Sequence, residues 1–117
     1  MFGLDPNQSF EFLERTVLLQ LCVGQNELIF RFDGDVDLAV ESELRIRNSR
    51  FDQRFSKSIE AARVAVDFLG REVSAVKARP DGTLDVEFGP AMSIEVYDSS
   101  MYYESYTLTW PKGLIVV

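Results

Sequence analysis

The middle of this chain repeats itself at a fixed offset. Residues 17–40 align without a gap on residues 73–96, fifty-six positions later. Four positions are identical in the two segments, because Val17, Leu28, Phe32 and Val40 recur as Val73, Leu84, Phe88 and Val96. From residue 28 onward the shared apolar residues fall on alternate positions, which is the period of a strand with one buried face. The repeat therefore predicts two related antiparallel β-meanders.

Turn residues bound the predicted strands in both segments. The first segment contains Gly24-Gln25-Asn26 and Asp33-Gly34, and the second contains Pro80-Asp81-Gly82 and Gly89-Pro90. These residue types favour tight turns because Gly and Asn tolerate positive φ and Pro fixes φ. The similar spacing of the turns supports the repeat, and each segment is expected to form three strands.

A helix is predicted between the two segments, over about residues 55–69. Its proposed buried face is spaced by three or four residues and consists of Phe55, Ile59, Ala62, Val66 and Leu69. Gly70 is suited to end it. The predicted fold is α+β, in which two related antiparallel meanders form one curved sheet or a flattened barrel and the helix packs on it. A chain of 117 residues that is 46% hydrophobic is expected to form a single domain.

Composition argues against several classes of function. The chain contains no histidine, which is the usual general base near neutral pH and the commonest metal ligand. Its single cysteine, Cys22, lies in an apolar run and is interpreted as a small buried residue. We therefore expect no enzymatic activity, no cofactor and no zinc site.

The segment Asp33-Gly34-Asp35-Val36-Asp37 resembles the start of a calcium-binding loop. Such a loop requires Gly at its sixth position and Glu at its twelfth, where this chain has Leu38 and Leu44. We interpret Asp33 as a turn residue and Asp35 and Asp37 as outward-facing strand residues, and we expect no metal site.

The formal net charge of −7 argues against nucleic-acid binding, because phosphate contacts normally require a basic face. The one basic stretch, Arg45–Lys57, is interpreted as a solvated connection before the helix, with a short strand at Leu44 and Ile46. No apolar run is long enough to span a membrane, and the first residues lack the pattern of a secretory signal. A cytoplasmic location is expected.

The best candidate site lies near the end of the chain. Strand alternation places Tyr102, Glu104, Tyr106 and Trp110 on one side, with Tyr103 on the other. A carboxylate among aromatic rings can be partly desolvated, which raises its pKa and suits a general acid or a ligand-binding hydrogen bond. The alternative is that Glu104 caps backbone amides or pairs with an arginine while the aromatic rings fill the edge of the core.

Several segments resemble a family of small bacterial domains of unknown function. They are Gly70-Arg71-Glu72-Val73, Gly82-Thr83-Leu84-x-x-x-Phe88, Ile94-x-Val96 and Tyr103-Glu104-Ser105-Tyr106-x-Leu108. That family carries a Gly-x-Leu-x-x-x-Phe hairpin and a late Tyr-Glu-Ala/Ser-Trp-x-Leu signature, and here Tyr106 stands in place of the Trp. The resemblance covers mainly residues 69–108 and implies no activity. The size and acidity of this chain are similar to those of bacterial immunity proteins.

The sequence favours a non-enzymatic protein-binding module with a basic partner, of the immunity or antitoxin kind. The alternative is a small-ligand-binding domain with a site near Glu104, and an enzyme that uses Glu104 with a tyrosine is a third hypothesis. The apolar, uncharged strand Leu114–Val117 predicts a two-fold homodimer to which residues 103–117 contribute.

Overall fold

The computed structural model describes residues 4, 5, 7–99 and 104–117. The strands of the first half are β1 (Leu18–Val23), β2 (Leu28–Phe32), β3 (Val36–Val40), β4 (Leu44–Asn48) and β5 (Phe51–Phe55). Helix α1 (Ser58–Ala65) and the 3₁₀ turn η1 (Val66–Phe68) follow. The strands of the second half are β6 (Ala75–Ala78), β7 (Leu84–Glu87), β8 (Ser93–Val96), β9 (Tyr106–Trp110) and β10 (Gly113–Val116).

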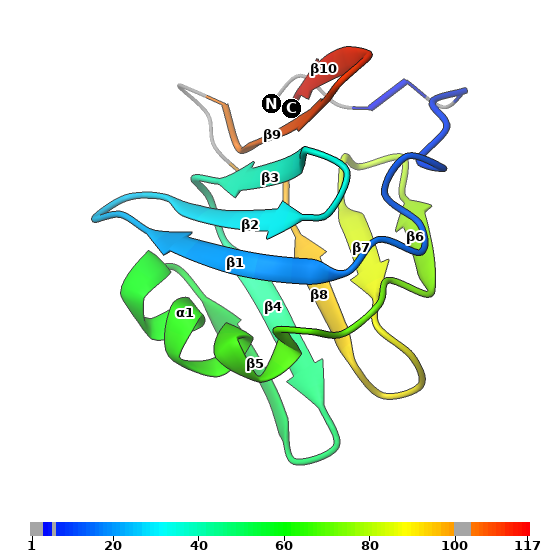
Figure 1. Cartoon of the computed structure of the whole chain (residues 1–117). Helices are drawn as coiled ribbons and strands as arrows, with labels where there is room; N and C mark the ends of the chain where they lie inside the picture. Colours follow the sequence, from blue (N-terminus) through cyan, green and yellow to red (C-terminus); the bar gives the residue numbers. More distant parts are fainter. Residues whose placement is uncertain (1–3, 6, 100–103) are drawn as a thin grey trace.

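The described strands form two five-stranded sheets, in the orders β1-β2-β3-β9-β10 and β5-β4-β8-β7-β6. All the pairings are antiparallel. In Figure 1 the strands β1 to β3 run across those of the other sheet, and α1 lies beside β1 and β5. The α+β expectation is confirmed in the coarse sense that the protein is mostly antiparallel sheet with one short helix.

The prediction of one curved sheet or a flattened barrel is wrong. After β3 the chain continues to β4 in the other sheet, and after β8 it returns to β9 in the first. Each three-stranded meander is therefore completed by the hairpin that follows the other meander. Apolar side chains on alternate positions then enclose a core between two sheets instead of inside a barrel.

The second and third strands of the two meanders pair in the same register. The matching pairs are Leu28 with Val40 and Leu84 with Val96, and Phe30 with Leu38 and Val86 with Ile94. The first strands do not keep the offset, because Ala78 lies opposite Leu84 where the gapless alignment requires Arg79. Strand β1 also has an irregularity between Leu18 and Gln20. Duplication of an ancestral meander remains a hypothesis.

The core lies between the inner faces of the two sheets. Phe88 stacks on Phe32 of the opposite sheet with ring centroids 6.4 Å apart, and it meets the edge of Phe68 at 5.1 Å. Phe10 and Leu13, from the segment before β1, are also buried. The aromatic contacts thus join both sheets and η1 in one hydrophobic cluster.

The predicted helix over residues 55–69 is too long, and three of the five residues on its proposed buried face are exposed. Phe55 stays in β5 because that strand pairs with β4 over residues 51–55. The buried residues of the helical segment are Ala61, Ala62, Ala65 and Phe68, whereas Ile59, Val66 and Leu69 are exposed. Small alanines let α1 approach the sheets closely. Gly70, with a φ of 83°, directly follows this segment, as expected.

Two other interpretations are corrected by the strand pairings. The basic stretch Arg45–Lys57 is not a solvated connection, because most of it forms the β4–β5 hairpin. Cys22 is a free thiol that is half-buried, and it lies opposite Ile29 on the outer face of its sheet. The apolar run around Cys22 reflects an edge strand, not a strand buried on both faces.

We predict that Phe88→Ala lowers the free energy of unfolding by about 3–5 kcal/mol, because it removes a buried ring that contacts both Phe32 and Phe68. Urea denaturation followed by tryptophan fluorescence measures this. Leu114→Ala is the control and should cost less than about 0.5 kcal/mol, since Leu114 is exposed. Equal losses for the two variants would contradict the packing described here.

Candidate functional site

The aromatic residues predicted to share one site lie in different environments. Tyr102 and Tyr103 are outside the described residues. Tyr106 is fully buried, its hydroxyl donates a hydrogen bond to the Gly82 carbonyl oxygen at 2.6 Å, and burial raises the pKa of Tyr106 well above its ordinary value. Trp110 is half-buried and stacks on Phe12 with centroids 3.9 Å apart. These two rings therefore support the fold.

Glu104 is exposed, and its carboxylate and that of Glu27 both lie near the Glu41 carboxylate. The backbone N–H of Glu41 donates to the Ser105 carbonyl oxygen at 2.9 Å, which brings the end of β3 beside the start of β9. Burial, followed by repulsion from Glu27 and Glu104, raises the pKa of Glu41 above its ordinary value. We call Glu27, Glu41 and Glu104 the acidic trio.

A cleft of about 530 Å³ opens next to Glu41 at one end of the two sheets. Its apolar lining comes from Leu28, Val40 and Leu44, which are core residues at strand ends. Its polar lining consists of Gln25, Asn26, Glu41, Ser42, Ser56, Lys57 and Ser58. We call it the end cleft. It presents amide, hydroxyl, ammonium and carboxylate groups that can donate and accept hydrogen bonds.

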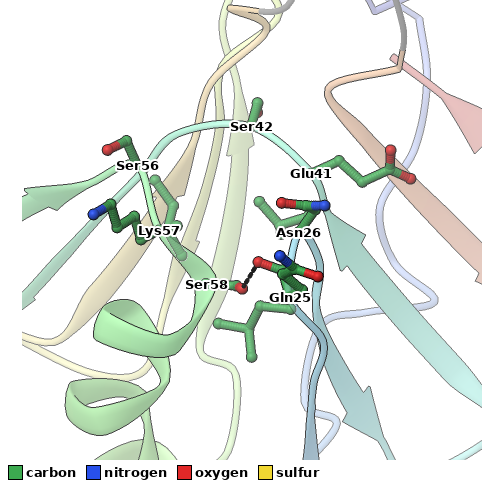
Figure 2. A pocket seen from close by; sticks show the side chains of 10 residues that line it. Gln25, Asn26, Glu41, Ser42, Ser56, Lys57 and Ser58 are labelled. Carbon is green, nitrogen blue, oxygen red and sulfur yellow. Dashed lines mark hydrogen bonds between the residues drawn. The ribbon is translucent and has the colours of Figure 1, made fainter.

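Three connections of the chain form the end cleft: the β1–β2 turn, the segment between β3 and β4, and the segment that leads from β5 into α1. The Ser58 hydroxyl at the start of α1 lies 2.6 Å from the Gly24 carbonyl oxygen and 3.1 Å from that of Gln25. This contact fixes the beginning of the helix against the β1–β2 turn. In Figure 2 the side chains of Ser56 and Lys57 lie on one side of the cleft, and the Glu41 carboxylate points away from them on the other.

The outer face of the second sheet carries a continuous network of charges. In register across that sheet, Arg54 lies beside Arg45, Arg45 beside Glu95, Glu95 beside Asp85, and Asp85 beside Lys77. Most of these groups are paired at short distance. Arg45 binds Asp52 through two nitrogens at 2.7 Å, and Arg54 binds Glu43 at 2.7 Å. We call this surface the charged face.

Glu95 is the centre of the charged face. Its side chain is only 4% exposed, and its carboxylate lies 3.2 Å from Arg79, 3.7 Å from Arg47 and 3.8 Å from Arg45. Tyr97 donates a hydrogen bond to it at 2.9 Å. Burial by itself would raise the pKa of Glu95, but the bonds from Tyr97 and Arg79 outweigh it and lower the pKa below its ordinary value.

The carboxylate of Asp85, next to Glu95, has fewer and longer contacts with cations and hydrogen-bond donors. Its side chain is 9% exposed and its nearest cation is Arg79, 3.7 Å away. Its Oδ1 atom is buried and accepts no hydrogen bond in the described part of the chain. Burial, then repulsion from Glu95 and Glu87, raises the pKa of Asp85. Asp85 lines a cleft of about 430 Å³, which we call the sheet cleft, together with Arg47, Lys77, Glu87 and Ser93.

Sequence reasoning missed Asp85 and Glu95. Both alternate with buried apolar residues, so the strand pattern places them on the solvent-facing side of their strands. Arg45, Arg47 and Arg79 lie against Glu95 on that side, and Arg79 is the cation nearest to Asp85, but the local sequence contains no signal for these contacts. No group of three or more Cys, Asp and Glu residues in the described ranges is arranged to hold a metal ion. Nor is any helix within them long and apolar enough to cross a membrane.

A model of a family of unknown function, DUF6188, matches residues 13–117. No curated protein and no solved structure matches the chain.

We predict that Glu41→Gln stabilises the protein near neutral pH. The pKa of Glu41 is raised in the folded state, so the folded protein binds this proton more tightly than the unfolded chain, and stability from Glu41 is lost as pH rises through the folded pKa. The substitution removes that loss and should raise the free energy of unfolding by about 0.5 kcal/mol at about pH 7.

Urea denaturation over a series of pH values measures the effect. The advantage of Glu41→Gln should shrink as the pH falls toward the ordinary glutamate pKa of about 4.3, because protonation then removes the charge of wild-type Glu41 as well. Glu14→Gln is the control, since Glu14 is also exposed but lies outside the acidic trio. An advantage that grows on acidification would contradict the repulsion described above.

Proposed function

Because the chain belongs to DUF6188, a family of unknown function, we propose its function from its own geometry: it is a non-enzymatic protein-binding module for a basic partner. We infer that it acts in the cytoplasm of a bacterium, in the manner of an immunity protein or antitoxin that covers a basic surface of a toxin. One half-buried free thiol, Cys22, fits a reducing compartment.

The acidic trio is the observation that carries this proposal. Glu27, Glu41 and Glu104 come from three separate parts of the chain, and Glu27 and Glu104 both repel Glu41. No ion pair in the described part of the chain includes any of the three. A basic partner would relieve this repulsion on binding, and the net charge of −7 would speed the encounter.

The form of the end cleft also favours a protein partner. Its walls are mostly polar side chains at turns and connections, and several of these residues are exposed. Pockets for small organic ligands are more often lined by apolar and aromatic side chains. Polar, exposed rims are typical of protein–protein interfaces.

The alternative is a small-ligand-binding domain with its site near Glu104. The volume of the end cleft, about 530 Å³, favours this alternative because it falls within the usual range for such sites. A ligand there would contact Asn26 and Glu41 and would carry both hydrogen-bond donors and a positive charge. An enzyme that uses Glu104 with a tyrosine has less support, because Tyr106 is buried and bonded to Gly82.

Affinity capture tests the leading proposal. The wild-type chain is compared with the triple variant Glu27→Gln, Glu41→Gln and Glu104→Gln, and the captured proteins are identified by mass spectrometry from cells that make this protein. The matched control is Asp35→Asn, Asp67→Asn and Glu72→Gln, which changes the net charge equally at other exposed positions. We expect one basic protein to bind the wild type and the control but not the acidic-trio variant.

A partner that binds all three proteins equally would contradict the role of the acidic trio. An acidic partner, or loss of binding in the control as well, would contradict the proposed charge complementarity. If capture fails and a small molecule shifts the amide resonances of Asn26 and Glu41, the ligand-binding alternative is correct.

We further propose a two-fold homodimer through the C-terminal hairpin. Strand β10 is the last strand of its sheet within the described residues, and Leu114 on it is 62% exposed. It carries no charged residue, and charges are a common protection of edge strands. Light scattering should give the mass of a dimer, and Leu114→Lys should give a monomer with an unchanged fold. A monomeric wild type would contradict the proposal.

A further inference from the structure

Burial of the Asp85 carboxylate costs free energy, and the neighbouring side chains do not offset this cost. An unpaired carboxylate oxygen loses its hydration when it is buried and gains nothing in return, unlike a paired one. Asp85 also lies directly opposite Glu95, and like charges at opposed positions destabilise a sheet. Folding alone would select against this arrangement.

The neighbouring cations are held by other groups. Lys77 lies opposite Asp85 in the sheet, but its ammonium binds Glu87 at 3.1 Å. The Arg47 Nε atom donates to the Ser93 hydroxyl at 3.1 Å. Arg79 is 3.2 Å from Glu95 but 3.7 Å from Asp85, so its hydrogen bond goes to Glu95. Asp85 therefore remains the carboxylate without a close donor.

The other sheet shows that this architecture does not require a carboxylate here. In the first meander Ile29 lies opposite Ala39, at the register positions that Asp85 and Glu95 occupy in the second. An apolar pair satisfies the same backbone geometry without any desolvated charge. The difference between the two sheets points to a use for Asp85 outside the fold.

The sheet cleft is where a ligand could contact Asp85. Asp85 lines a recess of about 430 Å³, and one wall is Lys77, whose side chain is 68% exposed. We propose that the sheet cleft binds a cationic side chain of the basic partner, an arginine or a lysine, with Asp85 as the acceptor of its hydrogen bond. This site rests on the proposed protein-binding function but is separate from the acidic trio.

The chemistry of the site favours a guanidinium. Its planar set of N–H donors can reach a carboxylate and a neighbouring acceptor together, and Glu87, whose carboxylate lies 3.1 Å from the Lys77 ammonium, lines the same recess. An anionic ligand is disfavoured because Asp85 and Glu87 line the recess, while Arg47 and Lys77 are already engaged. A guanidinium would also offset the repulsion among Asp85, Glu87 and Glu95.

Titration with blocked amino acids tests this proposal without knowledge of the partner. Nα-acetyl-arginine amide, Nα-acetyl-lysine amide and uncharged Nα-acetyl-glutamine amide are added to the full ¹⁵N-labelled chain, and the backbone amide shifts are followed. We expect saturable shifts at Asp85, Lys77 and Ser93 with the arginine compound, weaker ones with lysine and none with glutamine. Asp85→Asn should weaken the binding of the arginine compound by at least about tenfold.

Two further variants separate a binding role from a structural one. Asp85→Ile introduces the residue that the first meander carries at this register position, so it should abolish the shifts while its urea midpoint stays equal to or above that of the wild type. Asp37→Asn removes a carboxylate that lies 3.9 Å from Arg31 on the other sheet, and it should leave the titration unchanged.

The outcomes distinguish this site from the proposed function. Shifts confined to Gln25, Asn26 and Glu41 would overturn the role of Asp85 and leave the acidic trio as the binding surface. Unchanged shifts in Asp85→Asn, no shifts at all, or a lowered midpoint in Asp85→Ile would also overturn it. Shifts at Asp85 together with failed capture through the acidic trio would retain the sheet cleft and reject the acidic trio as the contact surface.

Discussion

The structure depends on strand pairing between the two halves of the chain. Strand β9 completes the first meander by pairing with β3, and β4 completes the second by pairing with β8. Leu38 thus lies opposite Leu108, and Ile94 opposite Ile46, so both sheets place buried apolar pairs at their centres. Because neither meander can complete its sheet with its own hairpin, we infer that the halves fold as one cooperative unit.

The same pairing determines the electrostatics of the protein. Strand β4 brings Arg45 and Arg47 next to Glu95, where the hydrogen bonds from Tyr97 and Arg79 already lower the pKa of this buried carboxyl. In the other sheet β9 brings Thr107 and Thr109 next to Ala39 and Asp37, and the described residues of that sheet form no comparable network of charges. Two sheets with matching inner registers therefore have different outer surfaces. The outer faces can carry different side chains because the core constrains mainly the residues that face inward.

Both candidate surfaces combine segments that are distant in the sequence. The end cleft joins the β1–β2 turn, the connection after β3 and the start of α1 (Figure 2). Glu104, which acts on Glu41 beside this cleft, comes from the second half of the chain. The sheet cleft joins β4, β6, β7 and β8. In each of them a carboxyl group with a raised pKa, that of Glu41 or Asp85, lies near like charges. A basic partner that reached both would relieve two separate repulsions.

The sequence by itself determined most strands and turns of the two meanders and their shared inner register from Leu28 to Val40 and from Leu84 to Val96, because side-chain alternation and turn chemistry are local properties. It also placed Glu104 in a candidate site. Only the tertiary structure decided that there are two sheets, that Ile59 and Val66 are exposed, and that Asp85 and Glu95 are buried. Alternation says which side of a strand faces the core but not which strand lies beside it. The neighbours that bury Asp85 and Glu95 are fixed by long-range pairing, which leaves no trace in the adjacent residues.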